Sequence, residues 1–245
     1  FKSGASNYST WLLFVQYACC FGVEITMNNA AAIYFSKRFF LSTEKAAAVA
    51  SIFGWMNIFA RGLGGYVSDK MNTRYGVRGR LIWQSTVLLL EGVLVIVFAY
   101  AGTLATSIVV LIFFSIFVQA AEGSTYGIVP YIDPLVTGSI SGIIGAGGSA
   151  GAVAFSLCFR QLAPKSAFII MGSIIMSSSL LSAFIHINDQ SVLFYNSQAH
   201  SIETQKCKIS EEDSATELGS PTSVNTTFSE FQEEKYETDL KLNSE

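Results

Sequence analysis

Residues 51–80, SIFGWMNIFARGLGGYVSDKMNTRYGVRGR, decide how the rest of the chain is interpreted. The stretch begins as an apolar segment with a single arginine, Arg61, and ends in a loop at 69–80 that carries four basic residues and one acid. An arginine in the middle of a membrane costs about 2.5–3.5 kcal/mol on insertion scales, and it is kept only with a partner or a function. Arg61 is therefore either a structural arginine paired with a carboxylate or part of a binding site.

Apolar residues are gathered into long runs. The chain is 51% hydrophobic and only 13% charged, against about 25% charged residues in soluble domains. A helix of about 20 apolar residues crosses the ~30 Å hydrocarbon core of a bilayer. We therefore expect an all-α membrane protein whose six transmembrane helices lie at about 11–35, 45–68, 81–101, 107–132, 138–159 and 166–187.

Charge divides the chain into two parts. Residues 1–188 carry 11 Lys and Arg against 6 Asp and Glu, a net charge of +5, whereas residues 189–245 carry 4 against 12, a net charge of −8. The acidic part has few large apolar residues, which is typical of disorder. We expect a six-helix transmembrane half at 1–188 and a disordered acidic tail at 189–245. Because Phe1 opens the chain without a start methionine, we interpret the chain as a fragment that lacks its amino-terminal part.

Basic loops tend to stay in the cytoplasm, so the loop at 69–80 is placed there. Six spans put both ends of the chain on one side, which makes the tail cytoplasmic, and we expect the plasma membrane. The loop at 36–44 has two basic residues and one acid, faces outside and counts against this orientation. In a cytoplasmic tail, Ser210 suits an acid-directed kinase because three acids follow it, and the glycosylation triplet at 225–227 stays unmodified.

Polar residues interrupt two of the spans at helical spacing. In the first span Tyr17, Glu24 and Asn28 share a face, which is either a polar helix contact or the wall of a cavity. The fourth span carries a comparable stripe of Ser115, Gln119, Glu122 and Tyr126. Carboxyl groups inside a membrane are costly and are often functional. Glu24 and Glu122 are therefore our candidates for proton coupling.

Small residues mark two further spans. The second span carries, on the same stripe as Arg61, the residues Gly54, Asn57, Gly64, Gly65 and Ser68. This stripe lets another helix approach closely and leaves room for a bound ion. The fifth span has six glycines within 14 residues, namely Gly138, Gly142, Gly145, Gly147, Gly148 and Gly151. Such a density indicates close packing against another helix, a backbone exposed to a ligand, or both.

No cofactor is expected. The four cysteines, Cys19, Cys20, Cys158 and Cys207, have neither metal nor disulfide spacing. Rossmann, P-loop, zinc and nucleophile-elbow motifs are also missing, so we expect neither an enzyme nor a nucleic-acid-binding protein. Glu91 is interpreted as a structural residue or as one with a partner on another helix, and His186 as an interfacial histidine.

The loop after the second span resembles the basic loop motif of the major facilitator superfamily. The matching residues are Gly65, Asp69, Lys70, Gly76 and Arg80. In that superfamily the motif lies on the cytoplasmic side between the second and third helices of each six-helix half. The resemblance implies that this chain forms one half of such a transporter.

Four stretches narrow the resemblance to the carboxy-terminal half of the high-affinity nitrate transporters, the nitrate/nitrite porter family. They are FGVEITMNNAAAIYF, FGWMNIFARGLGGYVSD, FSIFVQAAEGSTYGIVP and SGIIGAGGSAG. The resemblance implies that Arg61 binds the anion and that 145–151 is the glycine-rich signature, although Ser149 stands where family members commonly have Asn. The expected substrate-binding residues are Arg61, Asn57, Gly145, Gly147, Gly148, Ser149 and Tyr17.

The implied function is proton-coupled uptake of nitrate, or of nitrite, by alternating access. Its expected partners are nitrate, protons, the lipid bilayer and the missing amino-terminal half, together with an accessory subunit or a tail kinase. One alternative is a carrier of the same superfamily for another small anion or solute. Another is a membrane sensor that binds nitrate and signals through the acidic tail.

Overall fold

The computed structural model describes residues 2–187 and 190–191. The expected disordered tail therefore lies outside the described residues, apart from residues 190–191, and so do Ser210, Cys207 and the triplet at 225–227. The elements in chain order are α1 (Lys2–Ser6), α2 (Tyr8–Phe39), α3 (Thr43–Tyr75), α4 (Val77–Tyr100), α5 (Leu104–Ile132), η1 (Pro134–Val136), α6 (Thr137–Gln161), α7 (Pro164–Ser179), η2 (Leu180–Phe184), β1 (His186–Ile187) and β2 (Gln190–Ser191).

Within these residues, six helical segments are long and apolar enough to cross a membrane. They confirm the prediction of an all-α membrane protein with six transmembrane helices. The two-residue strands β1 and β2 pair antiparallel and follow the last helix. Helices α2 and α3, of 32 and 33 residues, exceed the length that a bilayer requires, so both continue beyond the predicted apolar windows.

The last span differs from the prediction, because the α-helix ends at Ser179 and continues as the 3₁₀ segment η2. The serine hydroxyls there bond to backbone carbonyls of the preceding turn: Ser178 Oγ donates to Ile175 O at 2.7 Å and Ser179 Oγ to Met176 O at 2.7 Å. Hydroxyls that compete for backbone acceptors loosen a helix. The serine cluster thus explains why the α-helix stops at Ser179, about two turns before the predicted end of the span.

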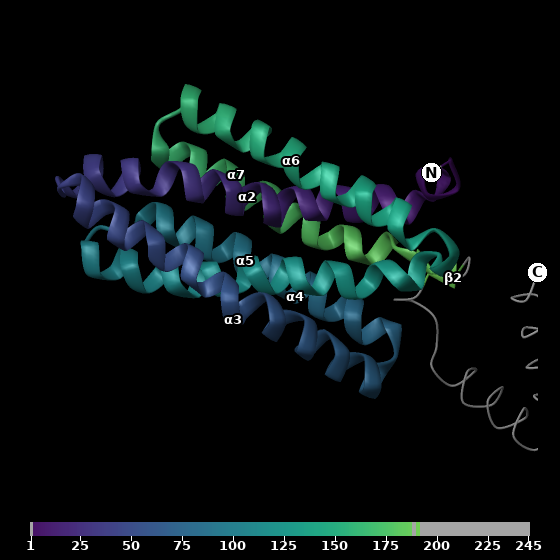
Figure 1. The fold of residues 1–245 in the computed structure, drawn as a ribbon. Helices are drawn as coiled ribbons and strands as arrows, with labels where there is room; N and C mark the ends of the chain where they lie inside the picture. Colours follow the sequence, from purple (N-terminus) through teal and green to yellow (C-terminus); the bar gives the residue numbers. More distant parts are fainter. Residues whose placement is uncertain (1, 188–189, 192–245) are drawn as a thin grey trace, which may run out of the picture. The chain divides into compact units, whose positions relative to one another are not determined.

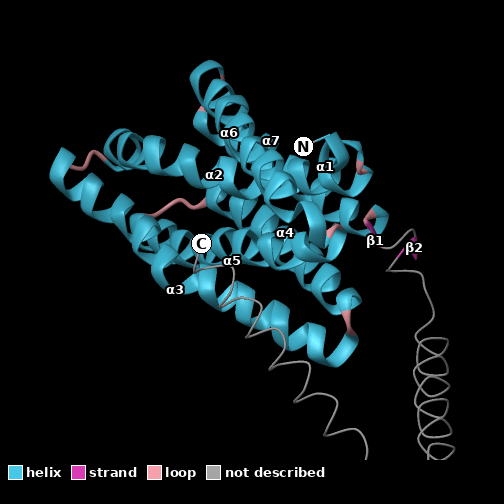
Figure 2. Ribbon diagram, turned by 45° about the vertical axis from the view of Figure 1, so that its right-hand side comes forward, coloured by secondary structure: helices cyan, strands magenta, loops and turns pink. Residues whose placement is uncertain are grey.

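The three most extensive helix contacts are those of α2 with α6, α3 with α5, and α4 with α7. Figures 1 and 2 show α3 and α6 on opposite sides of this group, with α2 and α5 between them. Each pair has a glycine at its crossing. A Cβ at Gly22 would lie 2.6 Å from the Gly151 carbonyl carbon, and one at Gly172 would lie 2.7 Å from the Gly92 oxygen. Backbones therefore touch directly, as small residues allow in membrane helices.

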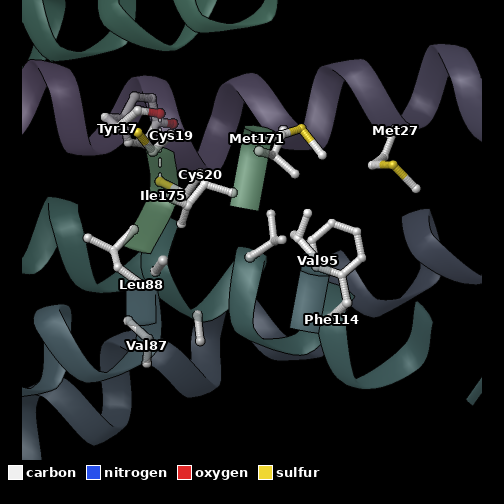
Figure 3. Packing of buried hydrophobic residues seen from close by; sticks show 14 of the residues in the cluster. Tyr17, Cys19, Cys20, Met27, Val87, Leu88, Val95, Phe114, Met171 and Ile175 are labelled. Carbon is white, nitrogen blue, oxygen red and sulfur yellow. Dashed lines mark hydrogen bonds between the residues drawn. The ribbon is translucent and has the colours of Figure 1, made fainter. Parts of the chain in front are cut away.

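The core between the helices is apolar and closely packed. Figure 3 shows Cys19 and Cys20 of α2 among apolar side chains that include Leu88 of α4 and Ile175 of α7. Both cysteines are buried and reduced. They therefore act as small core residues.

The glycine crossings yield a stability prediction. Gly172→Ala should lower the unfolding free energy by about 1–3 kcal/mol, because the new methyl group meets α4 backbone that cannot move away. The same substitution at Gly62, where no atom lies within 4 Å of the added Cβ, should be neutral or stabilising because alanine favours helix. Thermal unfolding of the chain in detergent measures the stability of both variants. An equal change in stability for Gly172→Ala and Gly62→Ala would contradict close packing of α4 on α7.

Candidate functional site at Arg61

Polar side chains from three helices meet at Arg61. Asn57 and Arg61 lie one turn apart on α3, and Gln119 and Glu122 lie three residues apart on α5. Glu24 reaches the same point from α2. Residues three or four apart share one face of a helix, so each helix presents its polar residues together to this point.

Glu24 is held by both of the α3 residues. Asn57 Nδ2 donates to Glu24 Oε1 at 2.8 Å, and Arg61 Nη2 donates to Glu24 Oε2 at 2.9 Å. Both carboxyl oxygens of this buried residue therefore have donors. The face of α2 that contains Glu24 is a polar contact with α3, which was one of the two interpretations of that face.

The same Arg61 nitrogen reaches α5. Nη2 donates to Gln119 Oε1 at 3.2 Å and forms an ion pair with Glu122 Oε2. Nη2 has two hydrogens but three acceptors, two of which belong to carboxyl groups. Glu24 and Glu122 therefore share one guanidinium nitrogen, and the two proton-coupling candidates belong to one cluster with Arg61.

The pairing of Arg61 with carboxyl groups is the arrangement expected of a structural arginine, but the guanidinium is not enclosed. The side chain of Arg61 is 38% exposed, against 7% for Glu24 and 0% for Glu122. Within the described residues Nη1 donates no hydrogen bond, and Gln119 Nε2 and Glu122 Oε1 are buried without a partner. The cluster thus combines two ion pairs with unpartnered donors, one on the partly exposed Arg61 and one on the buried Gln119, and both interpretations of Arg61 find support.

Two tyrosines lie next to this cluster. Tyr126 follows Glu122 by one turn on α5, and its ring meets the buried ring of Tyr17 edge to face, with 5.2 Å between centroids. A Cβ on Gly145 would lie 3.6 Å from the Tyr126 hydroxyl. Tyr17, Tyr126 and Gly145 therefore come together from α2, α5 and α6.

The glycine-rich segment of α6 has two faces. Gly147 and Gly148 are buried against Phe14 and Phe21 of α2, where an added Cβ would overlap those residues. Gly142 has open space beside it, and Ser149 is exposed. Close packing therefore accounts for Gly147 and Gly148, whereas Gly138 and Gly142 have open space beside them and Gly145 faces the Tyr126 hydroxyl. In the part of the chain that is described, no hydrogen bond joins Ser149 to the Arg61 cluster.

The loop motif ties three helices together at one end of the bundle. Arg80 Nη2 lies 2.6 Å from Asp69 Oδ1, and Arg80 Nη1 donates to Ser68 Oγ at 3.2 Å. The guanidinium also lies over the ring of Tyr131 from α5, at 5.0 Å from its centroid. Gly76, with φ of +64°, forms the turn between α3 and α4. Lys70 is exposed, and a Cβ on Gly65 would contact only Gly123 O, at 3.9 Å.

Two further residues complete the comparison with the sequence. Gln119 was placed on the α5 stripe but not among the binding residues, although its three-residue spacing from Glu122 could have indicated a shared partner.

Glu91 is fully buried in α4, and neither of its carboxyl oxygens has a hydrogen-bond partner in the described chain. The partner on another helix that we considered for Glu91 is therefore not found there.

Six membrane-spanning helices around a shared arginine–carboxylate cluster define a multi-pass membrane protein with a charged site inside the bundle. The chain is 44% identical over 158 residues to the high affinity nitrate transporter 2.5 of Arabidopsis thaliana, which covers 64% of this chain and 32% of that protein. It is 36% identical over 202 residues to the probable high-affinity nitrate transporter 2.4 of Oryza sativa subsp. japonica, covering 79% and 41%. The nitrate/nitrite transporter NrtP of a Picosynechococcus species is 37% identical over 160 residues, covering 64% and 29%.

These similarities confirm the predicted resemblance to the high-affinity nitrate transporters over this segment. The chain spans about a third of the length of the curated relatives it matches. No family model and no solved structure matches the chain. The chain is thus a homologue of part of these transporters.

The shared guanidinium yields a second prediction. Arg61→Gln should lower the unfolding free energy by up to about 3–5 kcal/mol, because Glu122 is then buried without a counter-charge. Adding Glu122→Gln to that variant should recover part of the loss, since the unpaired charge is removed. Thermal unfolding of the wild type, both single variants and the double variant forms a double-mutant cycle. Purely additive effects would contradict the pairing of Arg61 with Glu122.

Proposed function

We propose that this chain forms one half of a major facilitator superfamily transporter that takes up nitrate, or nitrite, together with protons by alternating access. The similarity to proteins named as nitrate and nitrate/nitrite transporters supports the substrate and a transport function rather than catalysis. The observation that carries the proposal is the partly exposed guanidinium of Arg61, which lies inside the span and has donors free beyond its carboxyl partners.

The chemistry of arginine suits the substrate. Nitrate is planar, singly charged and weakly hydrated, and guanidinium is planar and permanently charged, with donors that match paired oxygens. Arg61 Nη1 donates no hydrogen bond to any described residue, and on this partly exposed side chain we propose that it binds the anion. Asn57, Tyr17, Gly145, Gly147, Gly148 and Ser149 stay proposed binding residues, of which Gly147 and Gly148 act through packing on α2.

The carboxyl groups give a reason for proton coupling. One guanidinium beside two ionised carboxylates has a net charge of −1, and arrival of nitrate would make it −2. Two like charges about 4 Å apart repel each other by about 4 kcal/mol at an effective dielectric constant of 20, so this excess of negative charge is strongly unfavourable. Protons on Glu24 and Glu122 remove this excess negative charge. Glu122 Oε1, which is buried without a donor, is a place for one such proton.

The membrane potential requires the same coupling. Moving an anion into a cell that is negative inside costs about 2.3 kcal/mol per 100 mV. More than one proton must accompany each nitrate for the potential to drive uptake. Two carboxyl groups at one guanidinium are sufficient for that requirement.

A second half completes the proposed site. Many carriers bind their substrate near the bilayer midplane between two repeats, and rocking of the repeats exposes the site to each side in turn. Helix α3 packs on only one side in this chain, since Ala60 and Gly64 are buried whereas Ile58 and Phe59 are 65% and 70% exposed. We propose that the other half covers part of this surface and supplies a second arginine.

We place the protein in the plasma membrane, with the 69–80 loop in the cytoplasm.

Replacing the guanidinium tests the substrate assignment. In the complete transporter, Arg61→Lys should abolish saturable uptake of labelled nitrate while insertion into the membrane is retained, because lysine lacks the planar paired donors. Arg74→Lys, at an exposed arginine of the loop, is the matched control and should keep wild-type uptake. Nitrate uptake at normal affinity by Arg61→Lys would refute the assignment. Competition by nitrite, chlorate and organic acids tests the carrier alternative, and nitrate-induced proton currents test the sensor alternative.

A further experiment concerns the protons. In the wild type, nitrate binding should weaken as the pH rises, because ionised carboxyl groups repel the anion. Glu122→Gln keeps the hydrogen-bonding shape but is neutral, so nitrate binding should depend less on pH and the proton current per nitrate should fall. Glu44→Gln, at an exposed acid in the first turn of α3, is the control. An unchanged pH dependence in Glu122→Gln would exclude this carboxyl from coupling.

A further inference from the structure

A second polar region lies away from the Arg61 cluster. A cavity of about 640 Å³ opens where α2 and α6 end and α7 begins, and its lining includes Ile33 of α2, Phe159 of α6 and Pro164 of α7. None of the Arg61 cluster residues lines it. The proposed transport function makes no use of this cavity.

Basic side chains surround the cavity, and no acid lines it. They are Lys37, Arg38, Arg160 and Lys165. All four are exposed. In the described part of the chain none of them has a carboxylate within 4.0 Å, and Lys165 Nζ instead lies over the ring of Tyr100, at 4.2 Å from its centroid. Three helix ends thus bring four cations without counter-charges to one cavity.

Helix dipoles do not account for this arrangement. Cations in the last turn of a helix are favourable, which explains basic residues at the ends of α2 and α6. Lys165 stands in the first turn of α7, where a cation is unfavourable. The convergence of all four on one cavity therefore needs a further cause.

Membrane topology does not account for it either. Helix α3 begins next to the end of α2 and runs to Tyr75, so the cavity lies at the bundle end opposite the basic loop at 69–80. The positive-inside rule concentrates lysine and arginine on the cytoplasmic side. Four cations at the other end are in excess of what that rule predicts, and an anionic ligand would explain them.

The walls of the cavity indicate the class of ligand. Ile33, Ala99 and Phe159 make an apolar surface below the cations, and Asn29 and Ser156 add polar groups. The volume is large compared with the ~30 Å³ that one water molecule occupies in the liquid, so a lone small anion would fill little of it. We propose that this cavity binds an oxyanion of the phosphate class, carried by the head group of a membrane lipid whose chain lies against the apolar wall. Basic pockets between transmembrane helices on the matrix or cytoplasmic side bind anionic head groups through such contacts, and this cavity offers the same chemistry at the opposite end of the bundle.

The test uses the whole chain in neutral detergent. Phosphatidylglycerol should raise the Tm more than phosphatidylcholine does, and native mass spectrometry should show it retained. In the variant Lys37→Gln/Arg160→Gln, the Kd for phosphatidylglycerol should rise by about tenfold or more. A lipid titration measures this change in Kd. The control Lys45→Gln/Arg74→Gln loses the same charge at exposed positions that do not line the cavity, and it should bind as the wild type does.

Inorganic phosphate distinguishes the two sources of the oxyanion. One outcome is that phosphate raises the Tm of the wild type but not of Lys37→Gln/Arg160→Gln, while the lipid has no effect. The cavity is then an oxyanion site for a free ion, and the lipid assignment is wrong. Equal binding of phosphatidylglycerol to the wild type and to both double variants, without any effect of phosphate, would overturn the proposal. Neither result bears on Arg61, because the cavity and that cluster share no residue.

Discussion

The contact between Arg61 and the carboxyl groups of Glu24 and Glu122 is the interaction on which the bundle depends. A guanidinium inside a membrane is tolerated only when it is paired or solvated. Here one nitrogen contacts acids from two other helices, so α2, α3 and α5 are held at a common point. In the proposed function the same contact limits where an anion could approach, because Nη2 is occupied and Nε is buried, which leaves Nη1. Stability and the proposed function are therefore linked at a single side chain.

Much of the architecture could be predicted from the sequence, because membrane spans are encoded locally in apolar runs. The spacing of Asn57 and Arg61, and of Gln119 and Glu122, also placed these residues on shared helix faces. Their meeting across helices depends on tertiary packing, which spacing within one helix does not reveal. For this reason the sequence left two interpretations of Arg61 open, and the structure shows features of both. The early end of the last α-helix depends on hydroxyls that bond within a serine cluster, a detail that hydrophobicity does not report.

The glycine-rich segment has a packed face and an open face. Gly147 and Gly148 meet α2 so closely that any side chain would collide, whereas Gly142 on the other side of α6 faces open space. From the sequence, both faces look the same, since glycine has no side chain to distinguish a packed face from an open one. Packing on one face sets the position of the open face, so the two interpretations are parts of one arrangement.

The short connection between α2 and α3 has a consequence for biogenesis. Only residues 40–42 separate the two helices, and Glu24 and Arg61 lie on opposite arms of the resulting hairpin. If α3 left the translocon alone, its guanidinium would meet lipid without a counter-charge. Release of both arms together lets the carboxylate neutralise the arginine during insertion. We therefore expect the ion pair to make α2 and α3 enter the bilayer as a single unit.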